Sequence, residues 1–169
     1  MAVTLATLQN LPFAVDGRLI AFRDNPPPMG WTGGIRYRGV HVLYPLNACL
    51  VDCNYQAPTP LDAREHLSFV PNALGDTVYL HYEWNIISSV RLPNPAPANL
   101  NLFVTDNMSG CKFFVDTVNG STDLVVYHAN TQLHGAGALA DVDVQSLAAS
   151  NLLDQMHTDA MLEYAPAAL

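Results

Sequence analysis

The chain has 169 residues, of which 50% are hydrophobic and 13% are charged. Such a composition excludes intrinsic disorder and can fill one sizeable core. With 7 Lys and Arg against 15 Asp and Glu, the formal net charge is −8. Because phosphate-binding grooves need clustered cations, we expect no nucleic-acid or anionic-membrane binding. No apolar run reaches the roughly 20 residues of a membrane helix, and we expect no Sec signal peptide at the start of the chain.

Short segments rich in β-branched and aromatic residues fill the first 130 residues, and prolines punctuate them. Proline is excluded from helix interiors and central strands, so Pro26–Pro28 and Pro93–Pro97 are expected to be surface connectors. The segments themselves predict strands. They span residues 18–23, 35–46, 77–90, 100–105, 112–118 and 124–128.

The pattern becomes helical near the end of the chain. Apolar residues recur at steps of three to five and predict a C-terminal helix over residues 143–164. A shorter helix is predicted over Leu61–Phe69. The expected fold is therefore α+β, with residues 1–169 as a single domain that has a β-sandwich-like mixed sheet core and flanking helices.

Three cysteines, Cys49, Cys53 and Cys111, cannot all pair within one chain. Cys49 and Cys53 could hold a metal or form a disulfide, but no second Cys or His pair with zinc spacing accompanies them. We expect both to be buried or free thiols, with no metal and no cofactor in the protein.

A hairpin is predicted in the stretch that is most informative about function, Leu100–Asn130. Asn119-Gly120 lies between two β runs, and this dipeptide is typical of a two-residue hairpin turn. With the turn centred there, Cys111 directly faces His128. Directly opposed residues have Cβ atoms about 4.5–5.5 Å apart, so this register would bring the thiol and the imidazole together.

One facing pair opposes this register. Asp116 would lie across from Asp123, and like charges directly opposed are mildly destabilising. A longer loop that opens symmetrically around the turn would remove this pair and keep the register. A slip of one residue would instead put Cys111 and His128 on opposite faces.

The residues around Cys111 suit an acyl-transfer site. A thiol with an ordinary pKa of about 8.5 is mostly protonated at neutral pH until a neighbouring base draws its proton, and His128 is the candidate base. Ser109 and Gly110 lead into Cys111, where backbone N–H groups could bind an oxyanion. Thr105, which ends the preceding strand, is the candidate to hold the imidazole. Ordinary packing of a small residue beside a histidine is the alternative.

The order of Thr105, Met108-Ser109-Gly110-Cys111 and His128 resembles the Cys–His glutamine deamidases. This family includes the cytotoxic necrotizing factors, the Burkholderia lethal factor and the bacterial chemoreceptor deamidase. The Thr-to-Cys step of six and the Cys-to-His step of seventeen are similar to those of the chemoreceptor enzyme. The resemblance covers only Leu100–Asn130 and implies Cys111 as nucleophile, His128 as base and Thr105 as third member.

The resemblance implies hydrolysis of a glutamine side-chain amide in a target protein, with ammonia as the second product. Backbone N–H groups at Gly110 and Cys111 would hold the oxyanion, and the partner would be a protein with a reactive glutamine. It also implies a bacterial toxin or effector, secreted or injected, that acts in the cytoplasm of a target cell.

Three polar residues follow His128 closely and are candidate substrate contacts: Asn130, Gln132 and His134. For His134, a loop position without a role is the expectation. Three other functions stay open. An amine in place of water would give a transglutaminase. A Cys–His peptidase or amidase would typically carry its cysteine at a helix N-terminus. A non-catalytic β-rich binding module would use neither side chain for chemistry.

Overall fold

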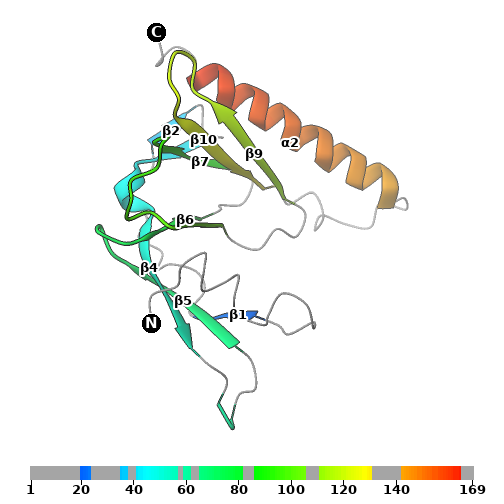
Figure 1. Cartoon of the computed structure of the whole chain (residues 1–169). Helices are drawn as coiled ribbons and strands as arrows, with labels where there is room; N and C mark the ends of the chain where they lie inside the picture. Colours follow the sequence, from blue (N-terminus) through cyan, green and yellow to red (C-terminus); the bar gives the residue numbers. More distant parts are fainter. Residues whose placement is uncertain are drawn as a thin grey trace.

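The computed structural model describes residues 20–23, 35–37, 41–56, 59–61, 65–81, 86–105, 111–130 and 142–164. These residues form two five-stranded mixed sheets and a long C-terminal helix (Figure 1). The predicted α+β class, with a mixed β core, is confirmed. Helix α2 (Val142–Tyr164) matches the predicted C-terminal helix and is the only α-helix within these ranges.

The first sheet has the strand order β1-β5-β4-β6-β8. Neighbours β1 and β5, and β6 and β8, run parallel, whereas β4 runs antiparallel to both of its neighbours. In chain order the strands are β1 (Ile20–Arg23), β4 (Leu50–Gln56), β5 (Glu65–Pro71), β6 (Thr77–Leu80) and β8 (Leu102–Thr105). Strand β8 therefore forms one edge of this sheet.

The second sheet has the strand order β2-β3-β7-β10-β9, in which only β3 and β7 run parallel. Its strands are β2 (Ile35–Tyr37), β3 (His41–Tyr44), β7 (Ile87–Leu92), β9 (Lys112–Thr117) and β10 (Leu124–Ala129). A 3₁₀ turn, η2 (Leu46–Ala48), leads from β3 of this sheet into β4 of the first. Strand β9 lies at the edge.

The predicted helix over Leu61–Phe69 is wrong, because most of this segment belongs to strand β5. Leu67 and Phe69 alternate with period two and are buried, as in a strand with one face on the core. Strand β5 also pairs on both sides, with β1 and β4. Pairing with distant strands overrides a local helical pattern. Strand β4 was not predicted, since its Asp52 and Asn54 are poor strand formers.

The second sheet is covered on both faces. Its inner face, the one toward the first sheet, contributes Val42, Val90 and Val126 to a core shared with Val78 and Leu80 of the first sheet. Its outer face packs against α2. Strand β10 is thus sandwiched between layers, so alternate side chains such as Val126 face the first sheet.

The buried stripe of α2 is narrower than the sequence predicts. Leu153, Met156 and Ala160, at steps of three and four, are buried against the second sheet. Leu152 and Met161 are also apolar residues of the predicted helix, but both are exposed. Among the described residues, no helix combines the length and apolar character that crossing a bilayer requires.

His41, in β3, is a fully buried histidine on the outer face of the second sheet. Its Nε2 lies 2.7 Å from the Ser89 hydroxyl, and its ring lies 6.2 Å from that of Tyr127. Burial disfavours the charged imidazolium and lowers the pKa of His41 from 6.5 to about 4. The folded protein therefore keeps His41 neutral where the unfolded chain would protonate it.

This pKa shift predicts acid sensitivity. Below pH 6.5 the imidazole of His41 binds a proton in the unfolded state but stays neutral in the native state. The free energy of unfolding therefore falls as the pH drops toward 4. Between pH 7 and pH 4.5 the loss from His41 alone should be about 2.5 kcal/mol. Urea unfolding of wild type and His41→Gln, whose amide does not titrate, measures it. Equal losses in both proteins would contradict the assignment.

Candidate functional site

The β9–β10 hairpin turns at Asn119-Gly120 as predicted, but its register differs from the prediction. Ser121 N donates to Val118 O at 3.0 Å, and Gly120 has a φ of +72°, which suits glycine. The ladder closes at Val118 and Asp123, whose N–H···O bond is 3.0 Å long, so four residues form the loop instead of two. The predicted direct pairing of Cys111 with His128 is therefore wrong.

Electrostatics explains the wider loop. The predicted register would oppose Asp116 and Asp123, whereas the observed register gives each carboxylate its own partner. Asp123 bonds to Arg91 with an Nε–Oδ2 distance of 2.8 Å, and this bond holds the pKa of Asp123 below its usual range. Asp116 lies 2.7 Å from Nε2 of His157 on α2. Both partners come from other elements, so the hairpin sequence alone does not reveal them.

The shift amounts to two residues, and side chains alternate with period two, so Cys111 and His128 still share one face. His128 now faces Phe113, and the continuation of the ladder places Cys111 opposite Asn130. Cys111 and His128 become diagonal neighbours, with Cβ atoms at most about 7–8 Å apart, a gap that an imidazole can span. Both belong to the inner face of the second sheet.

Asn130 contacts the thiol directly. Its Nδ2 lies 2.8 Å from Sγ of Cys111, and its backbone N donates to Ile86 O at 3.3 Å. The bonded pair Val118–Asp123 makes the Cys111–Asn130 position a non-hydrogen-bonded pair, where side chains approach most closely. Asn130 is only 2% exposed, whereas Cys111 is half-buried. The Asn130 amide therefore contacts the sulfur of Cys111 from the buried interior of the protein.

Thr105 joins the two sheets at the site. Its hydroxyl donates to Leu80 O at 2.8 Å, and its Oγ1 lies 2.5 Å from Nδ1 of His128. A threonine hydroxyl has one proton, so Nδ1 must carry the hydrogen of the second bond. This leaves the lone pair of the neutral ring on Nε2. The fully buried His128 is thus held in one orientation, and the hydrogen bond from Thr105 to Leu80 O assigns the proton of the neutral ring to Nδ1.

Ser88 is a neighbour that sequence reasoning missed. It pairs with His128 from strand β7, shares the inner face and is fully buried. Its hydroxyl has no hydrogen-bond partner among the described residues. Nothing local signals this neighbour, because the pairing of β7 with β10 joins segments about forty residues apart. The polar groups at this end of the inner face are therefore more numerous than the hairpin suggests.

Four predicted site residues lie outside the described residues: Ser109, Gly110, Gln132 and His134. The backbone of Cys111 is described, and it belongs to the set of alternate β9 positions that do not bond to β10. Its N–H is therefore directed away from β10, toward the open edge. Among the described residues, no group of three His, Cys, Asp or Glu side chains is placed to hold a metal ion.

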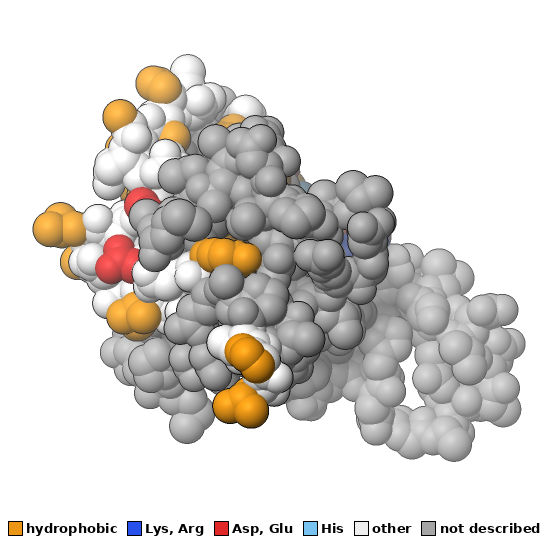
Figure 2. All heavy atoms as spheres, turned by 60° about the horizontal axis from the view of Figure 1, so that its bottom comes forward, with side chains coloured by type: hydrophobic (Ala, Val, Ile, Leu, Met, Phe, Trp, Pro, Cys, Tyr) orange, Lys and Arg blue, Asp and Glu red, His pale blue; other side chains and the backbone are white. Residues whose placement is uncertain are grey.

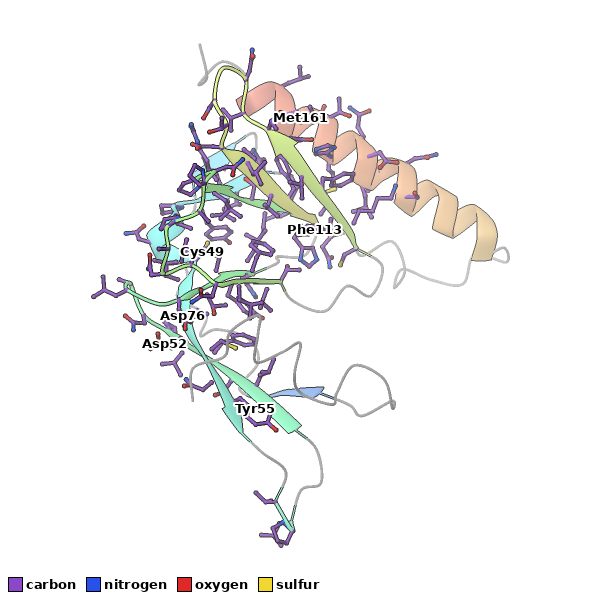
Figure 3. The ribbon with its side chains drawn as sticks, viewed as in Figure 1. Cys49, Asp52, Tyr55, Asp76, Phe113 and Met161 are labelled. Carbon is purple, nitrogen blue, oxygen red and sulfur yellow. The ribbon has the colours of Figure 1, made fainter. Side chains whose placement is uncertain are left out.

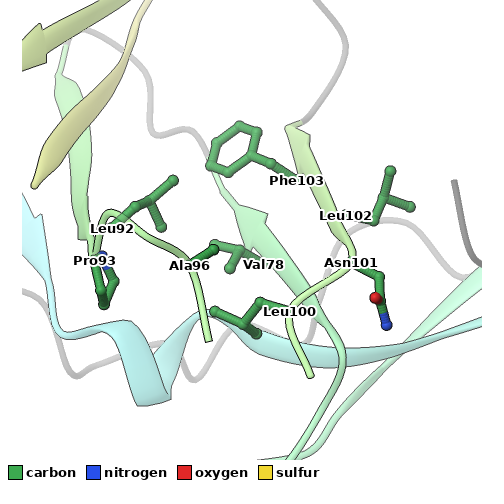
Figure 4. A pocket seen from close by; sticks show the side chains of 8 residues that line it. All are labelled: Val78, Leu92, Pro93, Ala96, Leu100, Asn101, Leu102 and Phe103. Atoms are coloured by element: carbon green, nitrogen blue, oxygen red, sulfur yellow. The ribbon is translucent and has the colours of Figure 1, made fainter. Parts of the chain in front are cut away.

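Figure 4 shows a mostly apolar pocket of about 210 Å³ that is separate from these residues. None of the predicted site residues lines it. Its lining residues are Val78, Leu92, Pro93, Ala96, Leu100, Asn101, Leu102 and Phe103. Phe103 connects the pocket with the site, since its ring lies 5.6 Å from that of Phe113 on β9, two residues after Cys111.

The comparisons with known proteins give no match: no family model, no curated protein and no solved structure is similar to this chain. The resemblance to the glutamine deamidases therefore rests on the motif residues alone.

The three cysteines differ in environment, and none forms a disulfide. Burial raises the pKa of both Cys49 and Cys53 to about 12, with Asp76 adding to the effect at Cys53. Since the thiolate is the nucleophile, both should be inert.

With iodoacetamide at pH 7.5, we expect Cys111 to react roughly 100-fold faster than either. Peptide mapping by mass spectrometry measures the rates, and equal rates would contradict an accessible, activated Cys111.

Proposed function

We propose that this protein hydrolyses the side-chain amide of glutamine in a target protein. Cys111 is the nucleophile, His128 the general base and acid, and Thr105 a positioning residue. One observation carries the proposal. Thr105 holds His128 with Nε2 as its basic nitrogen, and Cys111 lies on the same face of the hairpin. A thiol, a base and a group that orients the base are the parts that acyl transfer by cysteine requires.

In the first half of the reaction, Nε2 of His128 takes the Cys111 proton and the thiolate attacks the carboxamide carbon. The carbonyl oxygen becomes an oxyanion, for which the outward N–H of Cys111 is one donor, and Gly110 N–H is the second donor expected from the motif. The imidazolium then gives its proton to the leaving nitrogen. The C–N bond breaks, ammonia leaves and a thioester remains.

In the second half, His128 takes a proton from water, and the hydroxide formed attacks the thioester. The C–S bond breaks, the thiolate recovers the proton from His128, and glutamate is released. Water supplies the incoming oxygen, so the cycle consumes one amide and one water and yields one acid and one ammonia. The Nδ1–H bond to Thr105 keeps Nε2 in the right orientation throughout.

Asn130 has a defined part in this scheme. Its Nδ2–H points to Sγ, and a thiolate, unlike a thiol, can only accept hydrogen bonds. A hydrogen bond to an ionised group is about twice as strong as one between neutral groups, so this contact favours the attacking form of Cys111. Sequence reasoning named Asn130 as a candidate substrate contact. The geometry supports a role on the nucleophile instead.

The rival reactions share the same residues. A peptidase of the common Cys–His type would place its cysteine at a helix N-terminus, whereas Cys111 immediately precedes strand β9. Transglutamination differs only in the second half, where an amine replaces water. The role of a bacterial toxin or effector acting in a target-cell cytoplasm follows from the motif resemblance and forms part of the proposal.

The reaction is tested by incubating wild type and Cys111→Ala with human and bacterial cell lysates. We expect a gain of about one dalton on a glutamine, with ammonia release, from wild type only, because the reaction replaces NH₂ by OH. Cys53→Ala, at a buried thiol on β4 of the first sheet, is the matched control and should act as wild type. Cleaved peptide bonds would indicate the peptidase, and amine incorporation the transglutaminase. Identical lysate products from wild type and Cys111→Ala would contradict catalysis by Cys111 and favour a non-catalytic binding module.

Thr105→Val keeps the shape of the side chain and removes the hydroxyl that holds Nδ1 of His128. Since loss of orientation in an active site can cost about 100-fold, we expect kcat to fall by about that factor with little change in KM. Thr105→Ser restores the hydroxyl and should recover most of kcat. Steady-state ammonia release measures both variants. A Thr105→Val enzyme with wild-type kcat would exclude the positioning role.

A further inference from the structure

Among the described residues, no strand pairs with the outer side of β9, and we call this side its open edge. Since Val118 and Asp123 form a hydrogen-bonded pair, residues 112, 114 and 116 bond to β10, and residues 113, 115 and 117 direct their N–H and C=O groups outward. Within the described residues, β9 is the last strand of its sheet and no other strand pairs with this side. The edge therefore offers three residues whose backbone donors and acceptors no other described strand uses.

Among the described residues, the charged side chains of β9 do not protect this edge from pairing with another strand. Proteins guard edge strands with charged side chains, and β9 carries two, Lys112 and Asp116. Both point to the outer face, where α2 engages them. Lys112 Nζ lies 2.7 Å from the Asp154 carboxylate, and Asp116 is bound by His157. The two charged side chains of β9 thus interact with α2 on the outer face, and the inner face of the strand carries no charged side chain.

Two of the three inner-face side chains of β9 are apolar and exposed, and the third is the polar Thr117. Phe113 is 40% exposed and Val115 is 50% exposed, although their backbone belongs to a well-paired hairpin. Figure 3 labels Phe113 on β9. The ladder register puts Phe113 on the same hairpin face as Cys111, two residues along. On the face of the molecule in Figure 2, by contrast, the exposed hydrophobic side chains stand in separate small groups. On β9 the apolar row continues directly from the thiol.

We propose that the open edge of β9 binds the substrate protein as an added strand, with the target glutamine in an extended segment. This inference rests on the proposed function. A substrate strand fits this edge because Cys111, Phe113 and Val115 form one continuous row of side chains and one row of outward backbone groups. An incoming strand paired with residues 113 and 115 carries its next same-face residue to Cys111.

The pairing sets a substrate pattern. Residues on one face of a strand are two apart, so a glutamine at Cys111 requires apolar residues two and four positions away, against Phe113 and Val115. The same spacing holds for parallel and antiparallel addition, only on opposite sides of the glutamine. With a net charge of −8, the protein also favours a segment with basic flanking residues over an acidic one.

The test uses two substrates and two edge variants. One peptide has a central glutamine with Val or Phe at positions two and four on both sides and Lys at its ends. The reference substrate is the small amide benzyloxycarbonyl-Gln-Gly, which is too short to pair with the edge. Val115→Pro removes an outward N–H that the β9–β10 ladder does not use, and Val115→Lys places a charge in the apolar row. Val70→Lys, at a valine of 51% exposure on β5, is the matched control.

We expect both Val115 variants to lower the ratio of kcat/KM on the peptide to that on the small amide at least tenfold, and Val70→Lys to leave it unchanged. Moving the apolar residues to positions one and three should lower wild-type kcat/KM on the peptide similarly. An unchanged ratio in both Val115 variants overturns the edge assignment alone. A wild-type dimer that Val115→Pro dissociates, with the ratio unchanged, shows that a second copy pairs there and also overturns it. Absence of ammonia from both substrates contradicts the proposed function itself.

Discussion

The arrangement of the site depends on one threonine hydroxyl that connects the two sheets. Thr105 ends β8 at the edge of the first sheet and bonds to Leu80 O in the strand beside it. The same oxygen accepts the Nδ1–H of His128 from the second sheet. Because its only proton goes to a backbone carbonyl, the hydroxyl dictates which ring nitrogen is basic. A contact between layers of the fold therefore sets a chemical property of the imidazole.

The second constraint is the register of the hairpin, which decides what surrounds the thiol. A two-residue shift exchanges His128 for Asn130 as the residue opposite Cys111. The sulfur thereby gains an N–H donor, and the imidazole remains on the same face at diagonal distance. The shift also leaves Phe113 and Val115 in line with Cys111 on an open edge. Nucleophile, base and proposed substrate surface thus follow from one pairing pattern.

The sequence correctly predicted those elements whose formation depends mainly on interactions between residues close together in the chain. The Asn119-Gly120 turn, the strands on either side of it and the helix after residue 142 follow from turn chemistry and hydrophobic period. The predicted strand windows contain β1–β3, β6, β8 and β9 in full, most of β7, and β10 except its last residue. The single window over residues 77–90 is divided between β6 and β7, which belong to different sheets. The loop length was wrong because Arg91 and His157, which partner the two aspartates, come from distant elements. Strand β5 was predicted as a helix for the same kind of reason.

For the candidate site, the sequence could name Cys111, His128 and Thr105 but not how they meet. Thr105 was expected to hold the imidazole, but spacing along the chain does not reveal that it does so from the other sheet, or that Ser88 faces the imidazole from β7. Both depend on which strands become neighbours, and that choice is made by burial over the whole core. The role of Asn130 was obscured because it needs the correct register.

The tautomer of His128 tests this account most directly. Long-range proton–nitrogen NMR at neutral pH, with the signal assigned by its loss in His128→Gln, shows which ring nitrogen carries a proton. The account predicts a protonated Nδ1 in wild type, with this preference lost in Thr105→Val. A bare Nδ1 beside a protonated Nε2 in wild type would contradict it, because the ring could not then accept the proton of Cys111.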